Sequence, residues 1–191
     1  MIGRRGFVVA LALAGCDRSA PEAPPPSDAG VKASPERWRE LSFDASEHYP
    51  ERELAAVLAV PEAPLLIALH GRGEAGRGLE AGARGWRDDY DLDRAHQRLG
   101  APPLTAEDFH DFVKPERLRA MNQSLEKHPY KGLAVACPYT PALSDRSLTG
   151  SRPFAAFVRS VLVPRVRKEL SLSERTGIDG VSMGGRLALW L

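Results

Sequence analysis

Cysteine is nearly absent from the 191-residue chain, which contains only Cys16 and Cys137. Two cysteines cannot form the disulfide framework of a small secreted domain, and they cannot supply the four thiolates of a structural zinc site. The chain also lacks an H-E-x-x-H pattern or a close pair of histidines. We therefore expect no metal and no cofactor, and we expect Cys137, which ends an apolar run, to be a buried thiol in a strand.

An excess of charge of either sign is also lacking. The chain holds 26 Lys and Arg residues against 25 Asp and Glu residues, a net charge of +1, and it has no basic block with interleaved aromatic residues. Nucleic-acid-binding proteins neutralise phosphates with such basic patches, so we expect no nucleic-acid partner. With 43% hydrophobic residues, the chain can form one domain with a substantial core.

The N-terminal apolar segment, residues 7–14, is too short to span a membrane. It follows Arg4 and Arg5, an arrangement typical of a secretory signal. The Leu-Ala-Gly-Cys sequence that ends at Cys16 resembles the bacterial lipobox, in which the cysteine becomes the lipidated first residue of the mature protein. We therefore interpret residues 1–16 as a lipoprotein-type signal peptide, with an ordinary signal peptide as the alternative. The expected location is exported and anchored to a membrane by lipid, on the periplasmic or cell-surface side.

A linker is predicted at residues 17–37, which are rich in Pro, Ala and Ser and contain few large apolar residues. Such a composition cannot build a core and favours an extended tether. The folded domain is accordingly expected at residues 38–191.

Several apolar segments of this domain predict β-strands. Residues 41–45 alternate between apolar and polar, and residues 54–60 are apolar, which indicates two early strands joined by a turn. Residues 65–69 and 133–137 are apolar on both faces, as in buried parallel strands. A further strand is expected before residue 182. Strands alternating with helices predict an α/β fold, with a mostly parallel sheet and flanking helices.

The spacing of the strands predicts a helical insertion near residues 86–128. Roughly 60 residues separate two consecutive sheet strands, where one helix and its loops need about half as many. We predict helices at residues 91–99, at 105–112 with Thr105 as the cap, and at 115–127. The insertion is expected over the carboxyl edge of the sheet, and whether it is a lid or purely structural stays open.

After the insertion, apolar residues recur at helical spacing between Phe154 and Leu170. They predict a long amphipathic helix that Pro164 should kink.

The motif at residues 180–185, Gly-Val-Ser-Met-Gly-Gly, is typical of a sharp strand-to-helix turn with a serine at its apex. We expect Ser182 to adopt a strained, left-handed backbone conformation. Gly180 and Gly184, two residues away on either side, carry no side chain that could clash in such a turn. The backbone N–H of Met183 is then expected to point to the place where an oxyanion would form.

A second glycine motif, His-Gly-Arg-Gly-Glu at residues 70–74, directly follows the predicted strand at 65–69. Together with the serine motif, it resembles the α/β-hydrolase superfamily, and more closely the esterase group that includes esterase D and the feruloyl and enterochelin esterases. The resemblance implies a nucleophilic Ser182 and an acyl-enzyme. It also implies an oxyanion hole formed by the N–H groups of Met183 and Arg72, with His70 shaping the turn together with Gly71, Gly180 and Gly184.

The same resemblance places the acid and the histidine of the triad after the serine, yet no Asp, Glu or His follows Ser182. We therefore interpret the chain as a truncated, partial α/β-hydrolase fold that ends just after the nucleophile elbow. Its full-length parent is expected to be a serine hydrolase for small-molecule or peptide substrates of the ester type. The alternative is a catalytically inactive lipoprotein fragment or binding module.

A minor alternative is dinucleotide binding, because Gly71, Gly73 and Gly76 match the G-x-G-x-x-G pattern after a strand. That pattern needs a helix that starts within the glycines and an acidic residue at the end of a second strand. The glycines that follow, at Gly78 and Gly82, are unfavourable for such a helix.

Overall fold

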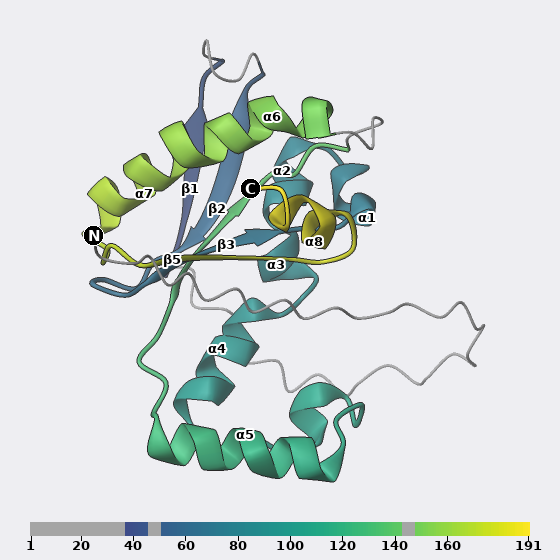
Figure 1. The fold of residues 1–191 in the computed structure, drawn as a ribbon, viewed down its shortest axis with the longest axis vertical. Coiled ribbons are helices and arrows are strands. Elements are labelled where there is room, and N and C mark those ends of the chain that lie inside the picture. Colours follow the sequence, from purple (N-terminus) through teal and green to yellow (C-terminus); the bar gives the residue numbers. More distant parts are fainter. Residues whose placement is uncertain (1–36, 46–50, 143–147) are drawn as a thin grey trace, which may run out of the picture.

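A five-stranded sheet with the strand order β1-β2-β4-β3-β5 lies at the centre of the structure (Figure 1). β2 is antiparallel to both of its neighbours, whereas β3 is parallel to β4 and to β5, so four of the five strands point the same way. The predicted α/β fold class is confirmed, with β2 as the antiparallel member. The strands are β1 (Trp38–Phe43), β2 (Glu53–Leu58), β3 (Leu65–Leu69), β4 (Ala134–Pro138) and β5 (Thr176–Gly180).

The computed structural model describes residues 37–45, 51–142 and 148–191. The predicted signal peptide with its lipid-attachment residue Cys16, and all but the last residue of the predicted linker at 17–37, lie outside these ranges.

The strands that were predicted to be buried on both faces, β3 and β4, occupy the interior of the sheet. Every residue of β4 is buried, including Cys137, whose thiol is free. Desolvation raises the pKa of this thiol far above its usual range. Cys137 is therefore the buried strand residue that its apolar neighbours indicated.

One face of the sheet packs against a continuous helical segment (Figure 1). This segment comprises α6 (Leu148–Phe157), a π-helical turn η3 (Val158–Leu162) and α7 (Val163–Leu170). The π-helical turn ends two residues before Pro164, where the sequence predicted a kink. Pro164 lies within this continuous segment, in the first turn of α7, so its missing N–H removes one helical hydrogen bond beside the π-helical turn.

The opposite face of the sheet is covered by the start of the insertion. Trp86 and Leu92 pack there against Ala68, Val135 and Cys137. The chain between β3 and β4 forms α1 (Arg72–Ala75), α2 (Leu79–Ala83), α3 (Gly85–Asp88), α4 (Leu92–Gly100), η2 (Glu107–Phe109) and α5 (Pro115–Lys127).

The predicted position of this insertion over the carboxyl edge of the sheet is wrong for α4 and α5. The indole N–H of Trp38, at the start of β1, donates to Asp93 of α4 at 2.6 Å. His96 of α4 contacts the carbonyl oxygen of Leu133, just before β4, at 3.2 Å. These contacts hold α4 at the amino ends of the strands, and Figure 1 shows α4 and α5 at the end away from α1, α2 and α8 (Met183–Ala188).

The helix predicted from Thr105 to Phe112 is also shorter than expected. The carboxylate of Asp108 accepts hydrogen bonds from the backbone N–H and the hydroxyl of Thr105, at 2.8 and 3.2 Å, as a capping residue does. Only one 3₁₀ turn follows, because His110 and Asp111 adopt left-handed backbone conformations, with φ of 49° and 61°. The predicted helices at 91–99 and 115–127 are present as α4 and α5, the latter with the predicted bounds.

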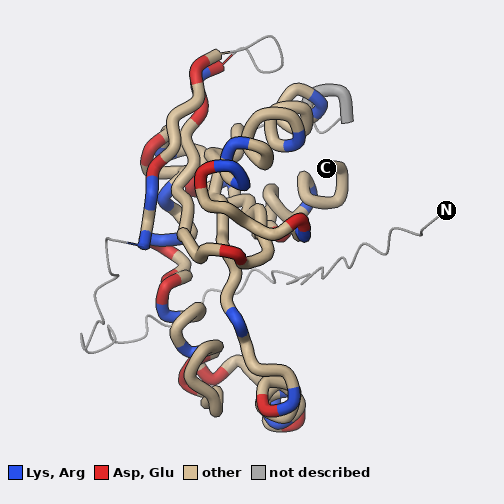
Figure 2. The backbone as a smooth tube through the Cα atoms, turned by 90° about the vertical axis from the view of Figure 1, so that its left-hand side faces the viewer, with Lys and Arg blue, Asp and Glu red and all other residues tan. Residues whose placement is uncertain are grey.

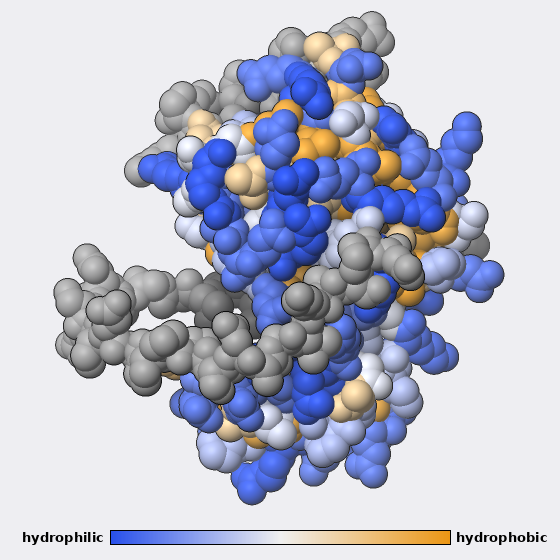
Figure 3. Space-filling view, turned by 180° about the vertical axis from the view of Figure 1, so that it is seen from behind, coloured by the Kyte–Doolittle hydropathy of each residue, from blue (hydrophilic) through white to orange (hydrophobic). Residues whose placement is uncertain are grey.

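Charges of both signs are mixed along the chain (Figure 2), whereas hydrophobic residues are concentrated on one part of the surface shown in Figure 3. Figure 2 shows Lys and Arg residues interspersed with Asp and Glu residues along the chain. From behind, hydrophobic residues show mainly on the part that holds the sheet, and the part with α4 and α5 is largely hydrophilic (Figure 3). Within the described ranges, no helix combines the length and the apolar character needed to cross a membrane.

Candidate active site

The serine motif forms a sharp turn between β5 and α8. Ser182 lies at the apex with φ of 54° and ψ of −110°, a conformation that a non-glycine residue rarely adopts. The turn is held at its base, where the N–H of Val181 donates to the carbonyl oxygen of Leu69 at 3.0 Å. A backbone strained in this way costs on the order of 1–3 kcal/mol, so the rest of the fold must impose it.

Two glycines allow this turn because other backbone segments pass too close to them for a side chain to fit. A Cβ atom on Gly184 would overlap the carbonyl oxygen of Leu69 and would lie 2.7 Å from that of His70. A Cβ atom on Gly180 would overlap the backbone of Gly184. The turn can therefore pack against the end of β3 only when both positions lack a side chain.

The two glycine motifs, which lie far apart in the sequence, meet at the carboxyl edge of the sheet. β3 and β5 are neighbours, and Leu69 pairs with Gly180 at their ends. The turn that follows β3 consequently lies beside the serine turn. A Cβ atom on Gly71 would lie only 3.7 Å from the Cβ of Ser182.

His70 is fully buried and bridges the turn after β3 to the chain after β4. The backbone N–H of Thr140 donates to Nε2 of His70 at 2.7 Å, so Nε2 is the unprotonated nitrogen. Nδ1 then carries the hydrogen and donates to the carbonyl oxygen of Gly71 at 2.9 Å. Burial lowers the pKa of His70 below its ordinary value of 6.5. Both ring nitrogens are engaged, and the imidazole is neutral.

Arg72 and Met183 are the first residues of α1 and α8, the helices that begin within the two glycine motifs. Neither of their backbone N–H groups donates to any acceptor within the described part of the chain. Oxyanion holes in this type of fold use the N–H that follows the nucleophile and an N–H in the loop after the third strand. Arg72 and Met183 occupy those two places in the chain.

Two polar residues that the sequence did not indicate as site residues also lie close to Gly71. The hydroxyl of Tyr90 and Oε2 of Glu74 lie 3.7 and 3.0 Å from the position of a Cβ on Gly71. Burial, and then the hydrogen bond to the Glu74 carboxylate, raise the pKa of Tyr90 to about 12. Glu74 ends the recognised His-Gly motif, but nothing in the sequence around Tyr90 points to this site.

A general base for Ser182 is not evident among the described residues, since no hydrogen bond there joins its hydroxyl to a histidine or a carboxylate. His70 is engaged as above, and His96 contacts Arg37 and Leu133. No group of three or more potential metal ligands occurs in these ranges either.

The dinucleotide interpretation does not fit the structure. The helix that begins within the glycines, α1, is a single turn that ends at Ala75. The next strand along the chain, β4, ends at Pro138 and is followed by Tyr139 and Thr140 rather than by an acidic residue. Both features that the pattern requires, a full helix and a ribose-binding acid, are therefore missing.

Comparisons with known proteins find matches among solved structures only. No family model and no curated protein matches the chain. Among solved structures, it is similar to the enterobactin esterase FES from Shigella flexneri, crystallised in the presence of 2,3-dihydroxy-N-benzoylglycine. The TM-score is 0.44 and the sequence identity 15%, over 80% of this chain and 32% of that protein. The chain thus spans about a third of the length of that esterase.

The architecture itself is consistent with a partial α/β-hydrolase fold. The sheet carries helices on both faces, and the serine stands on a strained strand-to-helix turn at the carboxyl edge.

Proposed function

We propose that the protein is a serine hydrolase that cleaves carboxylic esters through an acyl-enzyme on Ser182. The observation that carries the proposal is the positive φ of Ser182, on a turn that lies beside the turn after β3. Strain of this kind is retained where the surrounding structure imposes it, and it is common at active sites. The close-packed glycines explain how this structure imposes it.

In the proposed reaction, Oγ of Ser182 attacks the ester carbonyl carbon while a general base takes its proton. The carbonyl oxygen becomes an oxyanion and accepts hydrogen bonds from the N–H groups of Met183 and Arg72, each of which contributes about 10²–10³ in rate. Collapse of this intermediate expels the alcohol, which takes up the proton, and leaves an ester on Ser182. Water then releases the acid by the same steps.

The general base and its acidic partner would come from outside the described residues. His70 cannot serve as the base, because its unprotonated nitrogen already accepts the N–H of Thr140. We place both groups in a longer parent protein, after the serine, as the family resemblance implies. Without them the hydroxyl is a poor nucleophile, so the second candidate function is an inactive binding module.

We also propose that the protein is exported and is anchored to a membrane by a lipid on Cys16. Both proposals rest on the sequence that ends at Cys16, outside the described residues. Replacing Cys16 by Ser should shift the protein from the membrane fraction to the soluble one, and unchanged membrane partitioning would refute the anchor.

A fluorophosphonate probe tests the nucleophile in the whole protein. We expect labelling of Ser182 that disappears in Ser182→Ala and is retained in Ser171→Ala. Ser171 is a matched control, because it is also a serine with positive φ (51°), but it follows α7 and lies outside the glycine motifs. Labelling that persists in Ser182→Ala, or no labelling of the wild type, contradicts the proposal and favours the binding module.

A further inference from the structure

We propose that the pocket between α4 and η2 binds an organic carboxylate with a small apolar body. This proposal rests on the proposed function: the pocket would bind the anionic end of the ester that Ser182 cleaves. The pocket has a volume of about 200 Å³. Sites for whole drug-sized ligands are usually about 300–1,000 Å³, so this one suits a single ring or a short chain.

The walls of the pocket are largely apolar. Its lining includes Leu99 and Ala95 of α4, buried Leu104 and Phe109 of η2. Such a lining favours an apolar or aromatic group over a fully hydrated ion. The polar residues of the lining then determine which charge the ligand carries.

Asp108 forms an ion pair with Arg98 at the edge of the pocket. Its carboxylate accepts two hydrogen bonds from Arg98, at 2.8 and 3.1 Å, and two more from Thr105. Oδ2 accepts three of these bonds and Oδ1 one, and the guanidinium of Arg98 offsets the negative charge. Arg98 is likewise committed, since it also donates to the carbonyl oxygen of Pro103 at 2.8 Å.

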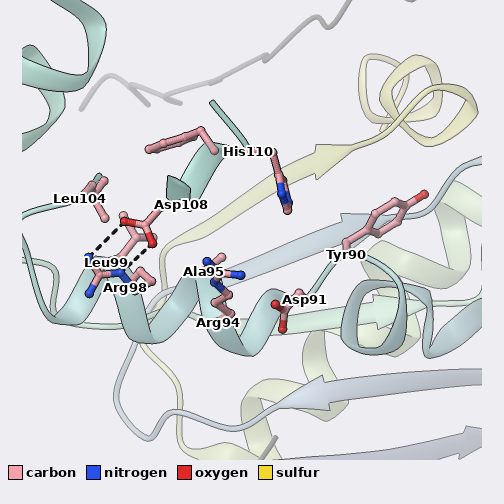
Figure 4. A pocket seen from close by; sticks show the side chains of 10 residues that line it. Tyr90, Asp91, Arg94, Ala95, Arg98, Leu99, Leu104, Asp108 and His110 are labelled. Carbon is pink, nitrogen blue, oxygen red and sulfur yellow. Dashed lines mark hydrogen bonds and ion pairs between the residues drawn. The ribbon is translucent and has the colours of Figure 1, made fainter. Parts of the chain in front are cut away.

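Arg94 and His110, by contrast, offer nitrogen atoms to the pocket. Within the described ranges, neither side chain has a hydrogen-bond or ion-pair partner. Figure 4 shows Arg94 rising from α4 into the space below the ring of His110, while the carboxylate of Asp91 points away from that ring. A guanidinium can bind a carboxylate through two parallel hydrogen bonds, which makes an organic acid the ligand that fits best.

The backbone at the mouth of the pocket is held in a strained form. Asp91 and His110, which both line it, have φ values of 48° and 49°. These two residues lie at opposite ends of the segment that encloses the pocket. The strain fixes where their side chains project, as expected at a ligand site.

Tyr90 connects this pocket with the serine turn. Tyr90 is one of the residues that line the pocket, and its hydroxyl and the Cβ of Ser182 both lie 3.7 Å from the position of a Cβ on Gly71. At that end, the carboxylate of Glu74 repels an anion. The proposal requires a substrate long enough to run along Tyr90 from Arg94, on α4, to Ser182, at the carboxyl edge of the sheet.

Binding of benzoate and of benzamide, its neutral isostere, tests the proposal by calorimetry or ligand-observed NMR on the whole protein. We expect benzoate to bind more tightly than benzamide. Arg94→Ala should weaken benzoate about tenfold, and Arg94→Lys less, because lysine keeps the charge without the planar fork. Benzamide binding should not change in either variant. Arg117→Ala is the matched control, since this exposed arginine lies on α5, away from the pocket.

Equal affinity of benzoate for the wild type and Arg94→Ala would overturn the proposal, as would equal affinity for benzoate and benzamide. Ser182→Ala should leave benzoate binding unchanged. Absence of fluorophosphonate labelling with intact benzoate binding would therefore refute the hydrolase function alone. In an active protein, Arg94→Ala should raise KM for esters that carry a carboxylate but not for neutral esters, with kcat unchanged. If Arg94→Ala left the KM for carboxylate-bearing esters at the wild-type value, the pocket would have no role in binding the substrate.

Discussion

The imidazole of His70 accepts a hydrogen bond from the backbone N–H of Thr140 at 2.7 Å, and this contact ties the end of β3 to the end of β4. Its other nitrogen holds Gly71, so His70 sets the position of the turn that faces Ser182. The first prediction follows from this clamp. His70→Ala leaves a buried N–H and a carbonyl oxygen without partners and should lower the free energy of unfolding by about 2–4 kcal/mol in urea denaturation.

The burial of His70 also makes the free energy of unfolding depend on pH. Burial lowers the pKa of His70 in the folded state, whereas the unfolded state takes up a proton near pH 6.5. The unfolded state thus binds more protons below that pH, and the stability present above pH 6.5 is lost as pH falls. His96, whose pKa burial also lowers, acts in the same direction. His70→Ala should therefore reduce this slope between pH 7.5 and 5.5, and an unchanged slope would contradict the assignment.

The second prediction compares two glycines of the candidate site. Gly184→Ala should cost more than about 3 kcal/mol or prevent folding, because its Cβ would overlap the backbone at the end of β3. Gly73→Ala is the matched control, since nothing lies within 4 Å of its Cβ position. It should change stability by less than about 1 kcal/mol. Thermal unfolding of both variants checks the pair, and equal effects would contradict the close packing.

Local patterns in the sequence were sufficient to predict several elements of the fold. β3 has the predicted bounds because its five residues are apolar and prolines bracket the connection before it. α5 begins at Pro115 as predicted, because proline is favoured in the first helical turn. The flanking glycines also predicted the positive φ of Ser182, although the packing of the turn against the end of β3 imposes it.

Contacts between distant segments could not be predicted in the same way. The side-chain bonds that hold α4 at the amino ends of the strands join residues such as Trp38 and Asp93, and no sequence pattern links these two. Tyr90 reaches the serine turn for a similar reason, since its position depends on how α3 packs on the sheet. Sequence reasoning therefore identified the glycine motifs but missed the residues that the insertion brings to them.

The third prediction concerns Glu53, which is buried at the start of β2. One of its carboxylate oxygens has no hydrogen-bond partner in the described part of the chain, and desolvation, together with Glu51, raises its pKa to about 8. The folded state then keeps a proton that the unfolded state loses near pH 4.5, so stability falls as pH rises from 4.5 to 8. Glu53→Gln should be more stable than the wild type at pH 7, by on the order of 3 kcal/mol, and the gain should vanish below pH 4.5.

Urea denaturation at pH 4.5, 7 and 8 measures this gain. Glu116→Gln, an exposed position on α5, is the control and should change stability by less than about 0.5 kcal/mol at every pH. If Glu53→Gln lowered the stability at pH 8, the carboxylate would have a partner and the explanation by burial would be wrong.

The last prediction separates the backbone strain at Ser182 from its chemistry. Ser182→Gly should raise the free energy of unfolding by about 1 kcal/mol, because glycine tolerates φ of 54° and the relieved strain exceeds the greater freedom of the unfolded chain. Ser182→Ala keeps a Cβ atom in the same conformation and should not be stabilised. Both variants should lose fluorophosphonate labelling. A glycine variant no more stable than the alanine variant would show that the turn is unstrained, and the main support for a nucleophile at this position would then be lost.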